Sequence, residues 1–165
     1  MAANVQDGRK TAAAQGDIVV FLVGMRINKL WAVRSWLPVF TAMPRMLKEL
    51  SKDASSGLLG FRVQLGGLRE FSVRQYWKSE EALFAYASAA DKEHRPAWAA
   101  YNRRARDGGA AVGVWHETYA VPAGRYEAVY VNMPPYGLGA AHGVEPVGRR
   151  GERAADRMWS GRVEG

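Results

Sequence analysis

The chain of 165 residues contains no cysteine and only three histidines. Without cysteine it cannot form disulfides, iron–sulfur clusters or thiolate zinc sites, and three histidines offer little for a non-haem metal centre. It also lacks the glycine-rich dinucleotide fingerprint, the P-loop and the nucleophile elbow, so nicotinamide, ATP and serine-hydrolase functions have no support. Histidine, carboxylate, tyrosine and arginine side chains are the groups left for chemistry.

Long apolar runs are missing as well. Ile18 to Val23 is far too short to cross a bilayer, and residues 1–16 have no apolar core of a secretory signal. The formal net charge is +7, but the arginines are spread along the chain without a helix-turn-helix, RNP-type or zinc-finger pattern. We therefore expect a cytoplasmic protein with neither a membrane nor a nucleic acid as its partner.

The composition is otherwise that of one globular domain, with 48% apolar and 11% aromatic residues. Residues 1–16 are small and polar without periodicity, and predict a disordered arm. The domain is expected to span residues 17–134, and residues 135–165 to form a tail rich in glycine and arginine. The sequence leaves open whether this tail wraps a partner subunit or stays loose.

Continuous or alternating apolar patterns predict five strands. They are expected at residues 17–27, 58–65, 70–77, 112–120 and 126–133. Gly66 and Gly67 mark a hairpin turn between the second and the third.

Helical spacing predicts a short leading helix and then a main helix within residues 30–52, divided by Pro38 and Pro44. Ser79 is expected to begin a further helix that runs to about Ala89, and a second piece of it begins near Arg95 or Pro96.

The predicted order of elements gives an α+β, ferredoxin-like βαββαβ fold with an added C-terminal strand. Such a fold has an antiparallel sheet with its helices on one face. The other face is apolar or aromatic in several strands and needs a cover. We expect a homodimer in which two sheets close face to face into a dimeric α/β barrel.

The strand at residues 112–120 carries the most unusual side chains. Alternation places His116 on one face, and Trp115, Glu117 and Tyr119 on the other. Because this combination is a poor choice for packing alone, we predict a functional site on this strand.

Three residues are candidate catalytic groups, each with a structural alternative. His116 is either a satisfied core or interface residue or a general base tuned by a carboxylate. Glu117 either orients a histidine or the substrate, or forms a salt bridge with Arg74 or Arg26. His94 is either an exposed loop residue or a ligand or acid/base.

Further side chains are candidate substrate contacts. Each tyrosine hydroxyl would bond either a phenolic or carbonyl substrate or a backbone carbonyl, the tryptophans would pack or line the site, and Asn28 would bind substrate or cap a turn. These candidates are Asn28, Arg74, Tyr76, Trp77, Tyr101, Trp115 and Tyr119.

The segment YWKSEEAL, with His94 downstream, resembles the dimeric α/β-barrel superfamily, which includes antibiotic-biosynthesis monooxygenases, haem-degrading monooxygenases and stress-responsive Dabb proteins. A small bacterial and fungal family of monooxygenase-like proteins is more similar still, and one of its fungal members belongs to a terpenoid biosynthesis cluster. This closer resemblance covers about residues 17–140 and is carried by VVFLVGMRINKLW, WLPVFTAMPRMLKEL, HRPAWAAYNRRAR, VGVWHETY and YVNMPPYGLG.

The resemblance implies a pocket between the helices and the sheet of each subunit. It implies either oxygenation of polycyclic phenols without metal or flavin, or haem bound through a histidine on the second helix. His94 is the nearest equivalent of that histidine, although its spacing departs from the haem-degrading pattern.

We therefore hypothesise a monooxygenase that acts with O2 on a hydrophobic aromatic, polyketide- or terpenoid-like small molecule and needs no cofactor. His116 or His94 would deprotonate the substrate, and tyrosine and arginine side chains would stabilise the developing negative charge. One alternative is a haem protein with His94 or His116 as axial ligand. The other is a non-catalytic or stress-related module that binds a lipophilic ligand.

Overall fold

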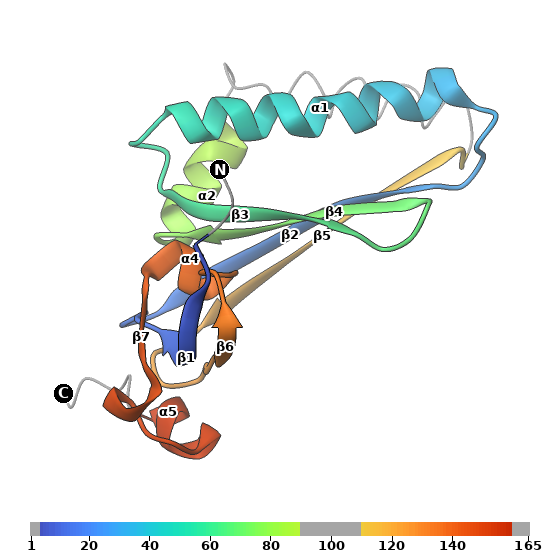
Figure 1. Cartoon of the computed structure of the whole chain (residues 1–165). Helices are drawn as coiled ribbons and strands as arrows, with labels where there is room; N and C mark the ends of the chain where they lie inside the picture. Colours follow the sequence, from blue (N-terminus) through green and yellow to red (C-terminus); the bar gives the residue numbers. More distant parts are fainter. Residues whose placement is uncertain (1–3, 90–109, 160–165) are drawn as a thin grey trace.

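The computed structural model of the chain describes residues 4–89 and 110–159 (Figure 1). Four antiparallel strands form the main sheet in the order β3-β4-β2-β5. Their bounds are Ile18–Ile27 for β2, Leu58–Leu65 for β3, Glu70–Trp77 for β4 and Val112–Val121 for β5. This strand order is that of the ferredoxin-like fold and confirms the predicted fold class. The main sheet is open at β3 and β5, and its closure into a barrel by a second subunit stays a prediction.

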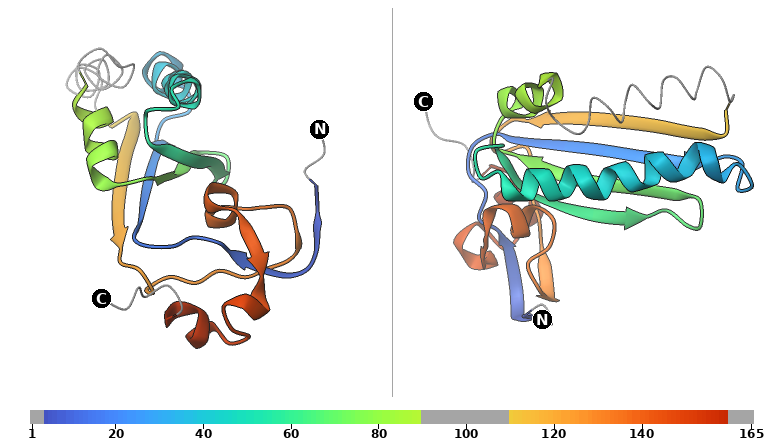
Figure 2. Two further views of the ribbon diagram at one scale, coloured as in Figure 1. Left: turned by 90° about the vertical axis from the view of Figure 1, so that its left-hand side faces the viewer. Right: turned by 90° about the horizontal axis from the view of Figure 1, so that it is seen from above.

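Helices α1 (Val33–Lys52) and α2 (Glu80–Ser88) lie on one face of the main sheet, which we call the helix face (Figures 1 and 2). The helix start predicted at Ser79 is confirmed, because its side-chain oxygen accepts a hydrogen bond from the Ala82 N–H at 3.2 Å. The predicted second piece of α2 lies outside the described residues.

The predicted division of the first helix is wrong, since α1 runs without interruption through Pro38 and Pro44. Each proline removes one backbone donor, but the apolar side of the helix packs along the sheet and holds it in one piece. The Thr41 hydroxyl also donates to the Leu37 carbonyl at 3.0 Å within the same stretch.

Two apolar clusters join these helices to the helix face. One gathers Val19, Leu50, Trp77 and Leu83, and the other gathers Met25, Ile27 and Val112 with Trp36 and Val39 of α1. The side chains that touch the helices on β2, β4 and β5 are therefore the odd-numbered ones of β2 and β4 and the even-numbered ones of β5.

The opposite face of the main sheet, which we call the open face, is covered at one end by the same chain. A small antiparallel sheet lies there in the order β6-β1-β7, together with helix α4 (Leu138–His142) (Figure 1). Its strands are β1 (Gln6–Ala12), β6 (Tyr130–Met133) and β7 (Val144–Pro146). A core cluster of Ala12, Ala14, Ile18, Tyr76 and Leu138 joins the small sheet and α4 to the main sheet.

The small sheet corrects three expectations. Residues 6–12 form a strand, not part of a disordered arm. The added C-terminal strand is present but shorter than predicted, and it pairs with β1. The tail is not loose over residues 138–159, because β7 pairs with β1, and its contact with a partner subunit stays a prediction. Each expectation failed because the pairing residues are more than a hundred positions apart, where no local pattern reports them.

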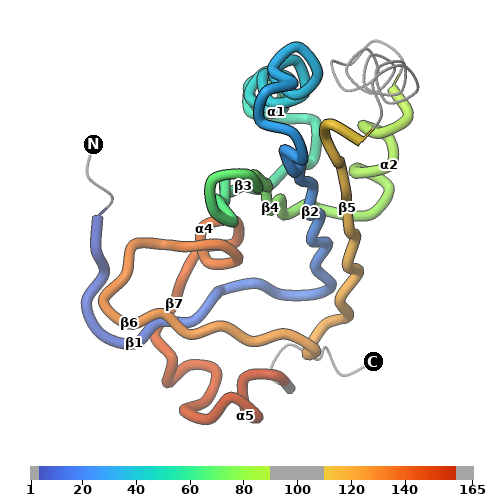
Figure 3. The backbone as a smooth tube through the Cα atoms, turned by 90° about the vertical axis from the view of Figure 1, so that its right-hand side faces the viewer, coloured from blue at the N-terminus to red at the C-terminus, as the bar shows by residue number. Residues whose placement is uncertain are grey.

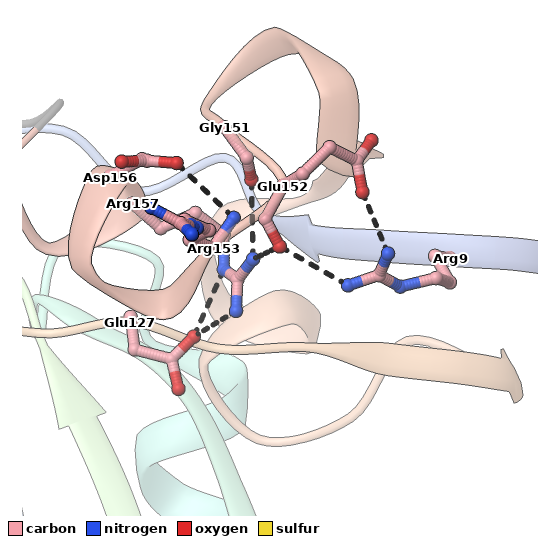
Figure 4. Close-up of polar contacts among 7 residues, drawn as sticks. All are labelled: Arg9, Glu127, Gly151, Glu152, Arg153, Asp156 and Arg157. Atoms are coloured by element: carbon pink, nitrogen blue, oxygen red, sulfur yellow. Dashed lines mark hydrogen bonds and ion pairs between the residues drawn. The ribbon is translucent and has the colours of Figure 1, made fainter.

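Polar contacts fasten the end of the chain to the small sheet (Figure 4). Arg157 of helix α5 (Ala154–Trp159) is buried and donates to one carboxylate oxygen of Glu127 from Nε at 3.0 Å and from Nη2 at 2.8 Å. Its Nη1 donates to the carbonyls of Gly151 and Glu152, and Arg9 of β1 forms an ion pair with the Glu152 carboxylate. The 3-10 helix η1 (Val147–Arg149) precedes this cluster, and α5 lies on the side of the small sheet away from the main sheet (Figure 3).

Candidate functional site

Strand register assigns each candidate to one face of the main sheet. Val23 of β2 lies opposite Val73 of β4 and His116 of β5, so these three side chains share one face. Val112 precedes His116 by four residues and therefore shares its face of β5, and it packs with Trp36 of α1. His116 therefore lies on the helix face, as its alternation with Val112 predicts.

The imidazole of His116 lies beside an aromatic ring on that face. The ring centroids of His116 and Phe21 are 5.8 Å apart, and the planes are tilted by 39°. His116 is exposed, Phe21 and Val23 are half-buried, and no residue in the described ranges hydrogen-bonds the imidazole. The strands thus present, next to apolar side chains, a histidine whose ring nitrogens are not hydrogen-bonded by any described residue.

Glu117 and Tyr119 point from the same strand to the open face. The Tyr119 hydroxyl donates to Glu117 Oε2 at 2.8 Å. This hydrogen bond, and then the negative charge of the carboxylate, raise the pKa of Tyr119 above its ordinary value. The alternative salt bridges of Glu117 are not formed: Arg26 donates to Glu70 at 3.0 Å, and Arg74 has no ion pair with a described residue.

Trp115, Arg74 and Tyr76 share the open face with Glu117. Trp115 lies across Gly24 of the neighbouring strand, because a Cβ added at Gly24 would come within 2.6 Å of the indole. Arg74 is half-buried, and Tyr76 is only 7% exposed beneath α4. The structure therefore places five candidates on the open face, with Tyr119 the fifth, and separates them from His116 by the thickness of the sheet.

Two further candidates have structural roles. Trp77 lies on the helix face at 1% exposure, and its indole N–H donates to Gln75 Oε1 at 3.0 Å, so it is a core residue and not a substrate contact. Asn28 accepts a hydrogen bond from Arg26, and its backbone N–H donates to the Ala111 carbonyl, which ties β2 to the start of β5. His94 and Tyr101 lie outside the described residues.

Sequence reasoning missed Phe21, Arg62 and Tyr136. Phe21 lies in a continuous apolar run in which no alternation marks the faces, so only the pairing with β5 shows that it meets His116. Arg62 was not predicted because its environment is formed by two distant residues. Arg74 lies opposite it on β4, and the Tyr136 ring lies against its guanidinium.

The described residues offer little for a metal or for haem. They contain no group of three or more histidine, aspartate and glutamate side chains that could hold a metal ion. His116 is the described candidate for an axial haem ligand, but the arginines of the main sheet, Arg26, Arg62 and Arg74, all lie on the open face. Haem propionates are commonly met by basic side chains, and none of these three arginines lies on the face of His116. No helix in the described ranges is long and apolar enough to span a membrane.

The fold and the aromatic-lined histidine define a ferredoxin-like α+β protein with a candidate acid/base site on its helix face. The chain belongs to the Monooxygenase af470-like family, whose model matches residues 18–138. This confirms the resemblance to a monooxygenase-like family.

Individual relatives are similar over part of their length. Monooxygenase af470 of Aspergillus fumigatus is 28% identical over 134 residues, which cover 76% of this chain and 46% of the relative. The chain thus spans about half the length of that curated relative. The crystal structure of aldoxime dehydratase OxdRE matches 86% of this chain and 42% of its own, with 16% identity and a TM-score of 0.65, which shows a shared fold. SnoaB, a cofactor-independent oxygenase from Streptomyces nogalater, matches 62% of this chain and 91% of its own, with 10% identity and a TM-score of 0.44.

Proposed function

We propose that the protein is a monooxygenase that uses O2 without a cofactor, with His116 as the general base. One observation carries the proposal: His116 lies exposed beside Phe21 on an apolar stretch of the helix face. An imidazole exchanges protons near neutral pH, and an aromatic ring next to it offers a stacking surface for a flat substrate. Membership of a family named after a monooxygenase supports the reaction class.

The substrate we propose is a hydrophobic, electron-rich aromatic molecule of polyketide or terpenoid type with an acidic CH2 group. His116 removes one proton from this group, and the carbanion attacks O2 to give a peroxide. The protonated imidazole returns its proton to the distal oxygen. The peroxide then loses water and leaves a carbonyl, so that one oxygen atom enters the product and the other becomes water. All electrons come from the substrate, and no external reductant is needed.

We also propose that the protein is a cytoplasmic homodimer. Part of the surface that suggested a dimer is already covered by the small sheet, but β3 keeps an exposed apolar row on the helix face. This row consists of Phe61, Val63 and Leu65, which are 42%, 55% and 70% exposed. An apolar row on an unpaired edge strand favours contact with another copy. Sedimentation of the wild type and of Val63→Lys would test it, since a monomeric wild type contradicts the proposal.

The reaction is tested by oxygen uptake with a panel of polycyclic phenols that carry a CH2 group. With isotope-labelled O2, the product should contain one labelled oxygen atom and the released water the other. The matched control is the same ring system with both CH2 hydrogens replaced by methyl groups, which His116 cannot deprotonate. Tight ligand binding without oxygen uptake would contradict the proposal and favour a passive binding module, and activity that requires added hemin would favour a haem protein.

A further inference from the structure

Two arginines face each other on the open face, and no described residue serves as their counter-ion. Arg62 of β3 and Arg74 of β4 are direct cross-strand partners, so their side chains rise side by side from the same face. Like charges opposite one another destabilise a sheet unless something neutralises them. Among the described residues neither guanidinium has an ion pair or a hydrogen bond.

A tyrosine hydroxyl lies beside this arginine pair. Tyr76 follows Arg74 on the same face, is 7% exposed, and its hydroxyl has no hydrogen-bond partner in the described part of the chain. Two consecutive residues before α4 contact both Arg62 and Tyr76. The centroid of the Tyr136 ring lies 4.1 Å from the Arg62 guanidinium carbon, and Gly137 packs against the Tyr76 hydroxyl. Arg62 and Tyr76 therefore lie within the reach of one dipeptide, and Arg74 lies between them in the register.

The acidic side chains of the open face are already engaged. Glu117 accepts the Tyr119 hydroxyl and stands two strands away from Arg74, which is about 10 Å across a sheet. Glu70 pairs with Arg26 at the far end of β4. Three donors thus lie at neighbouring positions of the register, where the described residues supply no free carboxylate, and such donors suit the binding of one.

We propose that Arg62, Arg74 and Tyr76 bind the carboxylate of an aromatic small molecule. The surface next to the donors is apolar, since the neighbouring strand presents the half-buried Val20 and Leu22 on the same face. The Trp115 indole, which lies over Gly24, borders this strip on the side of β5. A flat ring of about two fused cycles spans the distance from the arginines to the indole. This site is on the opposite side of the sheet from His116 and does not depend on the proposed reaction.

The test is calorimetric titration of the full chain with 2-naphthoate and with its uncharged amide. We expect naphthoate to bind about tenfold more tightly than the amide. Arg74→Met and Arg62→Met should each weaken naphthoate binding about tenfold, Tyr76→Phe should weaken it several-fold, and Arg74→Lys should give an intermediate loss. The matched control is Arg26→Met, which removes an arginine from the same face that is already paired with Glu70 and should leave the affinity unchanged.

Equal binding of naphthoate and its amide, or absence of binding with a folded wild type, would overturn the proposal. An equal loss in Arg26→Met would reduce the effect to overall charge and overturn it too. If Arg74→Met changes the sedimentation of the protein and not its ligand affinity, the carboxylate belongs to a second copy of the chain and the small-molecule site is wrong. Retained naphthoate binding in His116→Asn would separate this site from the proposed reaction.

Discussion

The helix face and the open face of the main sheet are built by the same four strands, but they differ in what covers them. The helices cover the helix face through apolar side chains such as Trp77 and Leu50. The open face carries the sheet's arginines and is covered at one end by three segments from both ends of the chain. His116 and Glu117, adjacent in sequence, therefore lie in two unrelated environments, and a functional site cannot be inferred from sequence proximity along a strand.

The largest effect should come from Arg157, the buried arginine that holds the cover of the open face. Arg157→Met removes the buried guanidinium together with its hydrogen bonds to Glu127 and to the carbonyls of Gly151 and Glu152, and the free energy of unfolding should fall by about 2–3 kcal/mol. Urea denaturation measures this change. Arg9→Met is the matched control, because its pair with Glu152 is half-exposed and should contribute less than about 1 kcal/mol. An equal loss of unfolding free energy in the two variants would mean that the burial of Arg157 adds nothing to its contribution to stability.

The next effect concerns Trp115 on the uncovered part of the open face. Gly24→Ala places a Cβ where the indole lies, and should lower the free energy of unfolding by about 1–2 kcal/mol and change the tryptophan fluorescence. Gly113→Ala is the control on the same face, since its Cβ would meet only the Asn28 side chain, at 3.7 Å. A fluorescence spectrum unchanged in Gly24→Ala would contradict the placement of the indole.

Acid should loosen the cover of the open face before the helix face. Burial lowers the pKa of His142 in α4 below its ordinary value of 6.5, and its Nε2 is buried without a hydrogen bond in the described residues. The unfolded chain then binds the proton more readily, so this contribution to stability is complete above pH 6.5 and is lost as the pH falls toward the lowered pKa. Denaturation across this range should show a shallower decline in His142→Phe, and parallel declines would refute the assignment.

The smallest expected effect is a change in the pKa of Tyr119. The hydrogen bond from Tyr119 to Glu117 raises the pKa of the phenol, so Glu117→Gln should lower that pKa toward its ordinary value of 10.0. Ultraviolet titration, with Tyr119→Phe to identify the signal, measures the shift. His116→Asn should leave it in place because His116 lies on the other face. A similar change of the Tyr119 pKa in both variants would contradict the placement of His116 and Glu117 on opposite faces.

The sequence predicted elements whose signals are local. The bounds of β3 and β4 agree with expectation because Gly66 and Gly67 punctuate two alternating runs, and Ser79 begins α2 by its own side chain. The alternation along β5 also predicted correctly that His116 and Glu117 point to opposite faces. The proline rule failed for α1, where packing on the sheet outweighs the missing backbone donors.

What could not be predicted depends on distant pairing. The small sheet joins Gln6–Ala12 to Tyr130–Met133 and to Val144–Pro146, and neither polar β1 nor the glycine-rich tail that contains β7 carries a strand pattern of its own. The arginine pair at Arg62 and Arg74 likewise requires the register of β3 on β4 and the return of Tyr136. Candidate residues could be named one by one, but their grouping required the fold.

The most direct test of the account compares oxygen uptake by His116→Asn and Glu117→Gln, neighbours on one strand that point to opposite faces. If the helix face holds the reacting base, His116→Asn should slow turnover about 100-fold or more, while Glu117→Gln should stay within about threefold of the wild type. Both variants should keep the wild-type melting temperature, since each side chain is exposed. A large loss in Glu117→Gln with an active His116→Asn would place the reaction on the open face and contradict the account.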